Sequence, residues 1–317
     1  MIEIDLHTRL DAYLALREAL GLSMRARRKL LRDFVAYLEK HGYGNPIRAQ
    51  LAVDWASSTS ATCGVAGQVA RLGLARGFLI HLKASLPETA IPDKHLLPAP
   101  RRPQPYIFSA SEISLLLEEA AQVGPRGSLR PHTYQTLLGL LASTGLRQSE
   151  AAKLLISDVQ LDKQPPRLLI RQTKFQKSRW VPLHYTVADQ LRRYAKLRRE
   201  MNYDAMSDSF FVSEQGGEIE PYNLRYAFRC LVSRLGLKPR PGQRHPTLHS
   251  LRHSFAVNRL RQWYETGADV RALLPNLSVY LGHVNLAASF WYLSATPELL
   301  GSAAQLFENY ESRGEKK

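Results

Sequence analysis

Apolar residues recur at helical spacing through the first part of the chain. Ser23 is placed to cap a helix that Gly42 ends, and its apolar face consists of Leu30, Leu31, Phe34, Val35 and Leu38. Asn45 and Pro46 resemble a helix cap followed by proline at the first helical position. A further helix is predicted over residues 65–83. We therefore expect the first part to be helical.

The second part alternates between helical and strand-like patterns. Ser109 and Glu112 have the spacing of a capping box before an apolar run. Strands are predicted over residues 168–170 and 180–183, with a polar hairpin loop between them. Helices are predicted over residues 133–143, 185–200, 222–235 and 248–262. The expected fold class is mainly α with a small antiparallel sheet: a helical N-terminal domain and an α+β second domain.

Proline divides these two parts. Six of the 18 prolines fall between Pro87 and Pro105. Because proline lacks a backbone donor and disfavours helix, this stretch is typical of an extended linker. We predict domains over residues 1–85 and 106–317, joined by a linker over residues 86–105. A single domain with a long proline-rich loop is the alternative.

The charge of the chain predicts a binding partner. The 43 Lys and Arg outnumber the 28 Asp and Glu, which gives a formal net charge of +15. Such a charge favours a polyanion, and nucleic acid is the usual one, although a generic basic surface would look the same. Four cations crowd the start of the helix that Ser23 caps and oppose its dipole, which makes them candidate phosphate contacts or a solvated charged face: Arg25, Arg27, Arg28 and Lys29.

Other features limit the class of protein. Cys63 and Cys230 form neither a disulfide framework nor a CxxC metal motif. The first residues lack the basic and apolar regions of a signal peptide, and no apolar run is long enough to span a membrane. We expect a protein of the bacterial cytoplasm, associated with the nucleoid and not with a membrane.

Candidate chemistry begins after the turn at Gly145. Arg147 is expected at the start of a helix, where an anion is favoured, with Glu150 close enough to support an arginine. The hairpin loop carries three further cations, Lys174, Lys177 and Arg179. A lysine there could donate a proton to a leaving oxygen, whereas phosphate positioning is the default role for two of the three.

Two later clusters complete the set. His249 and Arg252 share one helix face and could converge on a phosphate. His245 and His253 flank His249 at intervals of four, a spacing that could also hold zinc, although no HExxH motif is present. Tyr292 follows Leu281-Gly282-His283 by nine residues and, judged by its aromatic neighbours alone, could equally be a core residue.

Together these segments resemble the tyrosine recombinase (phage integrase) family. The sequence Thr144-Gly145-Leu146-Arg147-Gln148-Ser149-Glu150 is similar to its first arginine box. The hairpin Lys174–Leu183 is similar to its lysine segment, and His249–Ala256 to its HxLRH box. Leu281-Gly282-His283 with Tyr292 is similar to its C-terminal box. The four segments occur in the family's order, and Leu274–Tyr280 is similar to members encoded by transposons or integrative elements.

The resemblance implies roles without any cofactor or metal. Tyr292 is the expected nucleophile, Arg147 and Arg252 the phosphate clamp, and Lys174 the general acid. His249 and His283 would assist proton transfer and oxygen binding, and Glu150 would support the site. Phe175 stands where a glycine often follows the family's lysine, so Lys177 remains an alternative to Lys174.

The resemblance also implies partners. It predicts a site-specific recombinase, of integrase or transposase type, that acts as a homotetramer on two DNA duplexes and is a monomer or weak oligomer without DNA. The tail from Thr296 to Tyr310 could dock on a neighbouring protomer or on its own domain. The alternatives are a type IB topoisomerase-like relaxase, a DNA-binding accessory protein that has lost catalysis, and a metallohydrolase.

Overall fold

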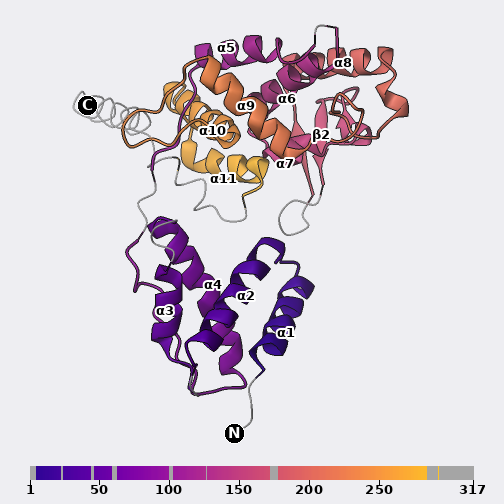
Figure 1. Ribbon diagram of the computed structural model, residues 1–317. Helices are drawn as coiled ribbons and strands as arrows, with labels where there is room; N and C mark the ends of the chain where they lie inside the picture. The colour runs from indigo at the N-terminus through magenta and orange to yellow at the C-terminus, as the bar shows by residue number, and fades with distance from the viewer. Residues whose placement is uncertain are drawn as a thin grey trace, which may run out of the picture. The chain divides into compact units, whose positions relative to one another are not determined.

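The computed structural model describes residues 5–22, 24–43, 46–58, 63–99, 103–125, 127–171, 178–283 and 292. The chain divides into two compact units, Met1–Arg102 and Pro103–Lys317 (Figure 1). The division at Arg102 falls inside the proline-rich segment.

In its described residues, the first unit has four helices: α1 (Leu6–Ala19), α2 (Arg25–Lys40), α3 (Ala49–Ser57) and α4 (Val65–Lys83). The apolar face predicted for α2 is in the core, where Leu31, Phe34 and Val35 are fully buried. Trp55 packs against Phe34 and donates from Nε1 to Asp33 at 2.9 Å. The bounds of α4 match the prediction.

The helix starts in this unit differ in part from the prediction. Met24 precedes α2 without a side-chain cap, and Ser23 lies outside the described residues. The prediction that Pro46 occupies a first helical turn is wrong, because α3 begins at Ala49 with Arg48 as its N-cap. Pro46 therefore lies in a bend before α3 and not in the helix itself.

The segment after α4 is tied to the first unit. Thr89 is buried, and the Ala90 amide donates to the Ile47 carbonyl oxygen at 3.0 Å. Leu97 packs against the first unit's core. Residues around Gln104 instead bond to the second unit, where Gln104 pairs with Gln243 in an isolated bridge. The stretch predicted as an extended linker is thus anchored at both ends.

The second unit is helical around a small sheet. Strands β1 (Val159–Gln160), β2 (Arg167–Ile170) and β3 (Arg179–Pro182) form an antiparallel sheet in the order β1-β2-β3, with Leu168 opposite Val181. The helices are α5 (Ala110–Ala120), α6 (Arg130–Thr144), α7 (Gln148–Ala152), α8 (Tyr185–Glu200), α9 (Pro221–Arg234), α10 (Leu248–Glu265) and α11 (Val270–Leu281), with 3-10 turns at Ile156–Asp158 and Tyr203–Ala205. The predicted fold class, mainly α with a small antiparallel sheet, is confirmed.

Helix α6 lies at the centre of this unit. It packs against α5, α8 and α10 (Figure 1), and its apolar residues point in several directions because neighbours surround it. The capping box predicted at Ser109 starts α5, with the Glu112 amide donating to Ser109 Oγ at 3.1 Å. A smaller core joins α10, α11 and Tyr292.

Helix α11 has no counterpart in the prediction. Pro275 lies inside it, and proline in a helix interior normally argues against a helix. Asp269 caps its start by accepting from the amides of Arg271 and Ala272, and Leu274, Leu277 and Leu281 are buried. No helix in the described part of the chain is both long enough and apolar enough to cross a membrane.

Candidate active site

Arg147 is placed by the end of α6 and the start of α7. Gly145 ends α6 with φ at +63°, and a Cβ there would lie 2.7 Å from the Phe255 ring. Only glycine fits this combination of left-handed backbone and close packing. Arg147 then precedes α7, and its amide donates to Glu150 Oε2 at 3.0 Å. The sequence prediction of a turn followed by a helix with Arg147 at its start is confirmed.

Arg252 reaches the same place from α10. It is 2% exposed and donates to the carbonyl oxygens of Gly145 and Leu281, each at 2.8 Å. Burial lowers the pKa of this guanidinium to about 10, with the Tyr292 hydroxyl opposing the shift and Arg147 adding to it. Arg252 therefore stays cationic at neutral pH.

The C-terminal end of α11 joins three arginines. The consecutive carbonyl oxygens of Tyr280, Leu281 and Gly282 accept, respectively, from Arg179, Arg252 and Arg147 at 2.9, 2.8 and 2.8 Å. The last carbonyls of a helix have no partner within it and carry the negative end of its dipole. This helix end therefore holds guanidinium groups from β3, α10 and the start of α7 in one cluster.

Arg179 and Glu150 form the buried base of this cluster. The Arg179 Nη2 donates to Glu150 Oε2 at 2.9 Å, and the two side chains are 11% and 7% exposed. Arg147 donates to the other carboxylate oxygen at 2.6 Å. Burial opposes ionisation of Glu150, but hydrogen bonding and charge from Arg179, with smaller contributions from Arg147, prevail and lower its pKa.

Arg179, which the sequence predicts as a DNA contact, makes its hydrogen bonds within the protein. Its guanidinium faces inward and donates to Glu150, to the Tyr280 carbonyl and to the Leu281 carbonyl. The geometry favours Arg179 as the residue that orients Glu150 and the α11 end.

His283 follows α11 directly. Its amide donates to the Ser278 carbonyl oxygen at 2.9 Å, which fixes the residue beside the arginines. Burial lowers the pKa of its imidazole to about 4, and repulsion from Arg252, Arg147, His249 and Arg179 acts in the same direction. The ring is therefore neutral at neutral pH and can donate one hydrogen bond without adding charge.

Tyr292 lies in the same neighbourhood within a single chain. It is 2% exposed, and its hydroxyl lies 3.2 Å from His253 Nδ1. The Tyr292 ring is stacked near His283, with centroids 6.1 Å apart, and edge-on to His253 at 5.5 Å. His253 in turn meets His249 edge-on at 4.5 Å. The sequence suggested His253 only as a possible zinc ligand, and its contact with Tyr292 was not predicted.

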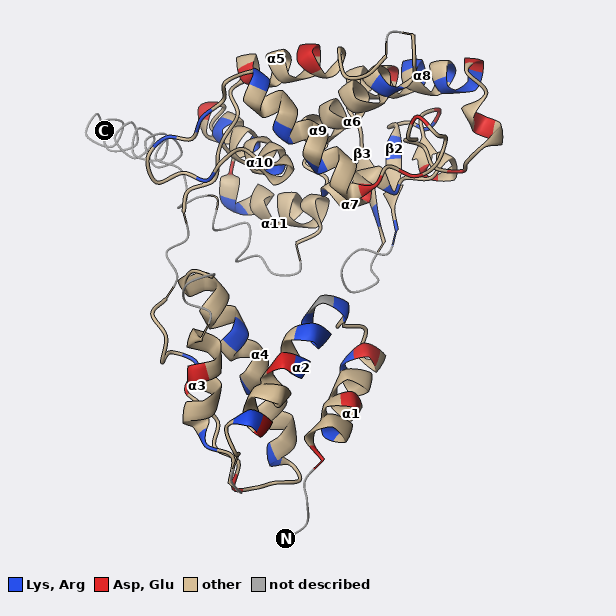
Figure 2. Cartoon of the chain, viewed as in Figure 1, with Lys and Arg blue, Asp and Glu red and all other residues tan. Residues whose placement is uncertain are grey.

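Other predicted residues fall outside the described part of the chain or belong to the first unit. Lys174, Lys177 and the tail from Thr296 to Tyr310 lie outside the described residues. The strand ends that flank the hairpin loop are anchored, with Arg171 paired to the buried Asp158 and Arg179 held in the cluster. In the first unit, the predicted DNA-contact residues Arg25, Arg27 and Lys29 are exposed, while Arg28 pairs with Glu18 at 2.9 Å. Lys and Arg residues gather at the start of α2 (Figure 2).

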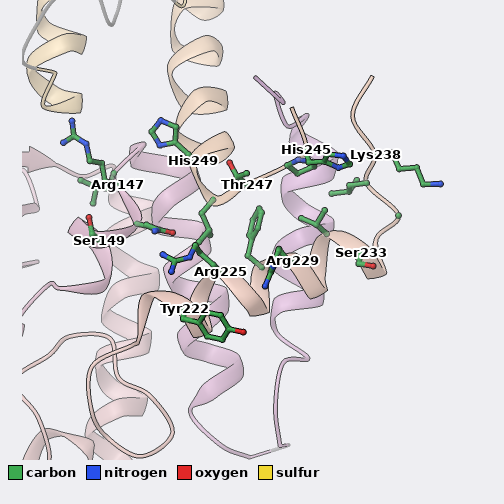
Figure 3. Close-up of a pocket in the computed structure, with 18 residues that line it drawn as sticks. Arg147, Ser149, Tyr222, Arg225, Arg229, Ser233, Lys238, His245, Thr247 and His249 are labelled. Atoms are coloured by element: carbon green, nitrogen blue, oxygen red, sulfur yellow. The ribbon is translucent and has the colours of Figure 1, made fainter. Parts of the chain in front are cut away.

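A pocket of about 1020 Å³ opens beside the arginine cluster. Figure 3 shows Arg147 and His249 at one end and Lys238 at the other, with Arg225 and Arg229 of α9 between them. Leu146, Phe228, Val232 and Leu237 supply its apolar wall. The sequence prediction assigned nothing to α9, although two arginines four residues apart on one helix face were a usable signal.

The histidines of α10 were also candidate zinc ligands. Within the described residues, no group of three or more His, Cys, Asp or Glu side chains is gathered so that it could hold a metal ion. The donor set at the site consists instead of guanidinium, imidazole and phenol groups, which suit an anion.

Comparison with known proteins gives consistent matches. Residues 107–298 match the model of the phage integrase family. A Sinorhizobium fredii protein described as an integrase/recombinase, y4rB, is 39% identical over 93% of this chain and 95% of its own length. A crystal structure of the XerH site-specific recombinase, bound to a palindromic difH substrate after cleavage, has a TM-score of 0.64 at 20% identity over 83% of this chain and 73% of that one. A lambda integrase tetramer bound to a Holliday junction has a TM-score of 0.61 at 15% identity over 89% and 78%.

Proposed function

Because this chain belongs to the phage integrase family of tyrosine site-specific recombinases, we propose that it cuts and rejoins double-stranded DNA through a 3′-phosphotyrosine at Tyr292. The proposed reaction uses neither a metal ion nor ATP. The observation that carries this proposal is the shared anchorage of Arg147 and Arg252 on adjacent carbonyls, Gly282 and Leu281, beside a buried tyrosine.

The arginine pair has the chemistry that a phosphodiester needs. Guanidinium groups bind phosphate oxygens through planar pairs of donors and keep their charge. Two cations fixed before the substrate arrives stabilise the extra negative charge of a pentavalent phosphorus without reorganising. Glu150 and Arg179 hold Arg147 and the α11 end in place, which supports such preorganisation.

Proton handling divides among the remaining residues. When the Tyr292 oxygen bonds to phosphorus, the bond from phosphorus to the 5′ oxygen breaks, and that oxygen must gain a proton. We assign this proton to Lys174, with Lys177 as the alternative. His283, held neutral by burial beside cations, donates a hydrogen bond to a phosphate oxygen, and His249 assists from the pocket side. A 5′ hydroxyl from a second duplex then attacks the phosphotyrosine, so bond energy is conserved.

The pocket beside the cluster extends the proposed DNA surface. It starts at Arg147 and His249 and continues along the exposed Arg225 and Arg229. Cations arranged beyond a reactive phosphate position are suited to neighbouring phosphates of the same strand. In the first unit, Arg25, Arg27 and Lys29 are assigned the same kind of contact.

Assembly on DNA is part of the proposal. Strand exchange joins two duplexes and needs four cleavages, so four copies of the chain are the smallest complete set. The lambda integrase structure that shares this fold is a tetramer on a Holliday junction. We propose the same stoichiometry here, with integration, excision or transposition of a mobile DNA element as the biological outcome.

A nicked suicide duplex tests the chemistry. The DNA is built on the sequence that the full chain selects from a randomised duplex pool, and nicks are placed at successive positions. Wild type should become covalently linked to DNA in the presence of EDTA, and Tyr292→Phe should not. Linkage by Tyr292→Phe would disprove the nucleophile assignment.

Two further outcomes would identify another function. Relaxation of supercoiled plasmid without the selected site would indicate a topoisomerase-like enzyme. Sequence-specific binding with no covalent product at any nick would indicate an accessory protein.

A further inference from the structure

We infer that His253 accepts the proton of Tyr292 when this tyrosine attacks DNA, an inference that rests on the proposed function. The hydroxyl of Tyr292 lies 3.2 Å from His253 Nδ1, within reach of a hydrogen bond. A phenol is a weak nucleophile until a neighbouring group removes or shares its proton. The contact therefore places a group capable of accepting a proton at the nucleophilic atom.

The surroundings of Tyr292 and His253 provide a route by which the proton can leave. Tyr292 is 2% exposed, so bulk water has little access to its side chain. His253 is half-buried, and its ring meets the exposed His249 one helical turn earlier at 4.5 Å between centroids. The rings of Tyr292, His253 and His249 thus lead from the interior to the pocket, where a proton can leave.

The neighbouring histidine is less suited to the role. His283 stacks with Tyr292 at 6.1 Å between centroids and 18° between ring planes. Its pKa is lowered to about 4 by burial and by the nearby arginines, so its affinity for a proton is weak. His253 instead meets Tyr292 at 62°, with Nδ1 toward the oxygen.

The step requires His253 to be neutral before attack, with its proton on Nε2 and its Nδ1 lone pair facing the phenol. As the Tyr292 oxygen bonds to phosphorus, the phenol proton moves to Nδ1 and His253 becomes an imidazolium. The 5′ oxygen leaves with a proton from the general acid. In the reverse step the imidazolium returns its proton to the departing phenol.

The first test uses His253→Asn. An asparagine amide can still form a hydrogen bond from about the position of Nδ1, but it cannot take a proton at neutral pH. The rate of covalent linkage to the nicked duplex, measured under single turnover, should fall by about 100-fold or more. Affinity for the same DNA and the unfolding temperature should not change. His132→Asn, at an exposed position in the first turn of α6, should react like wild type.

The second test locates the defect on the nucleophile. A duplex with sulfur in place of the bridging 5′ oxygen has a leaving group that needs no acid, so it should restore variants of the general acid but not His253→Asn. Fluorotyrosine at position 292 loses its proton more easily and should reduce the defect of His253→Asn.

Three results would overturn the inference: a wild-type rate for His253→Asn, restoration by the sulfur substrate, or no effect of fluorotyrosine on the defect. All three leave the proposed function intact as long as wild type still links to DNA and Tyr292→Phe does not. Failure of wild type to link to any nicked duplex would instead reject the proposed function.

Discussion

Three arginines share the end of α11, but their surroundings give them different tasks. Arg252 and Arg147 hold one carbonyl each there, and Arg147 is the more exposed of the two, with 30% of its side chain accessible. Arg179 is 11% exposed and donates to both oxygens of Glu150. At the scale of single residues, position in the sequence motif does not distinguish a proposed phosphate ligand from a proposed support. The partners of the guanidinium do.

Arg179→Gln tests this division of tasks. The substitution removes one of the two arginine partners of the buried Glu150 carboxylate and leaves Arg147 as the other. We expect the free energy of unfolding to fall by about 3 kcal/mol in urea titrations. The salt dependence of DNA affinity should stay as in wild type. Arg225→Gln is the matched control, because Arg225 is exposed in the pocket. Its free energy of unfolding should not change, whereas the slope of the logarithm of the DNA association constant against the logarithm of salt concentration should decrease in magnitude by about 1. The reverse pattern would make Arg179 a DNA contact.

His283 gives the site a pH dependence. Its pKa is about 4 in the folded chain, below the ordinary value of 6.5. The unfolded chain therefore binds the proton more readily, and stability is lost as pH falls from 6.5 toward 4. We expect His283→Gln to flatten the fall of the unfolding temperature within this window. Below about pH 4.5, the loss of stability from Glu150, whose pKa is lowered, should be the same in both proteins. Equal slopes between pH 6.5 and 4 would show that His283 is not desolvated as described.

At the scale of elements, the junction after α11 depends on one glycine. Gly282 has φ at +68°, and a Cβ there would lie 2.6 Å from Arg179 Nη1. Gly282→Ala must therefore adopt a strained backbone and displace the guanidinium that orients Glu150. We expect a loss of about 2–3 kcal/mol in the free energy of unfolding together with loss of covalent linkage to the nicked duplex.

Gly267 provides the control for that strain. It ends the turn after α10 with φ at +69°, and nothing lies within 4 Å of a Cβ built on it. Gly267→Ala should lose only about 1 kcal/mol and keep its linkage activity. Equal effects of the two substitutions would show that the close approach of Arg179 is unimportant.

Elements with strong local signals were predicted well from the sequence. The capping box at Ser109 starts α5, and the bounds of α4 and the hairpin strands agree with the apolar pattern to within a residue at most ends. Helix α11 was missed because Pro275 lies within it, and burial of its leucines outweighs the lost hydrogen bond. Strand β1 has two residues, too few for any period to be visible.

The site was predictable to the extent that motifs are local. Boxes around Arg147, His249 and Tyr292 identify candidate chemistry because each is a short run. The link between Arg179 and Glu150 joins residues 29 apart, and the contact of His253 with Tyr292 joins residues 39 apart. Such contacts depend on how α7, β3, α10 and α11 pack, which no local pattern encodes. The supporting roles proposed for Arg179, Glu150 and His253 rest on these contacts.

At the scale of the whole molecule, the chain has separate cores. The first unit buries residues such as Phe34 and Trp55, and the second unit is built around α6, with no buried residue common to both. Each unit also carries exposed cations: Arg25, Arg27 and Lys29 in the first, and Arg225 and Arg229 in the second. A chain of this construction can hold DNA through two attachments, each weak alone.

Removing the first unit tests this interpretation. Residues 103–317 have their own core and should fold, which circular dichroism and a cooperative thermal transition would show. Their affinity for the selected duplex, measured at one fixed salt concentration, should be about 10²–10⁴-fold lower than that of the full chain, because binding of the second attachment is no longer intramolecular.

A second variant distinguishes the contribution of these cations from that of the rest of the first unit. It is the full chain with Arg25, Arg27 and Lys29 all changed to Gln. Four cations at the start of α2 oppose the helix dipole, and Met24 supplies no side-chain cap, so these substitutions should not destabilise the unit. If each of the three meets a phosphate, the slope of log K against log salt should fall by about 3. An unchanged slope, or equal affinity of residues 103–317 and the full chain, would confine DNA binding to the second unit.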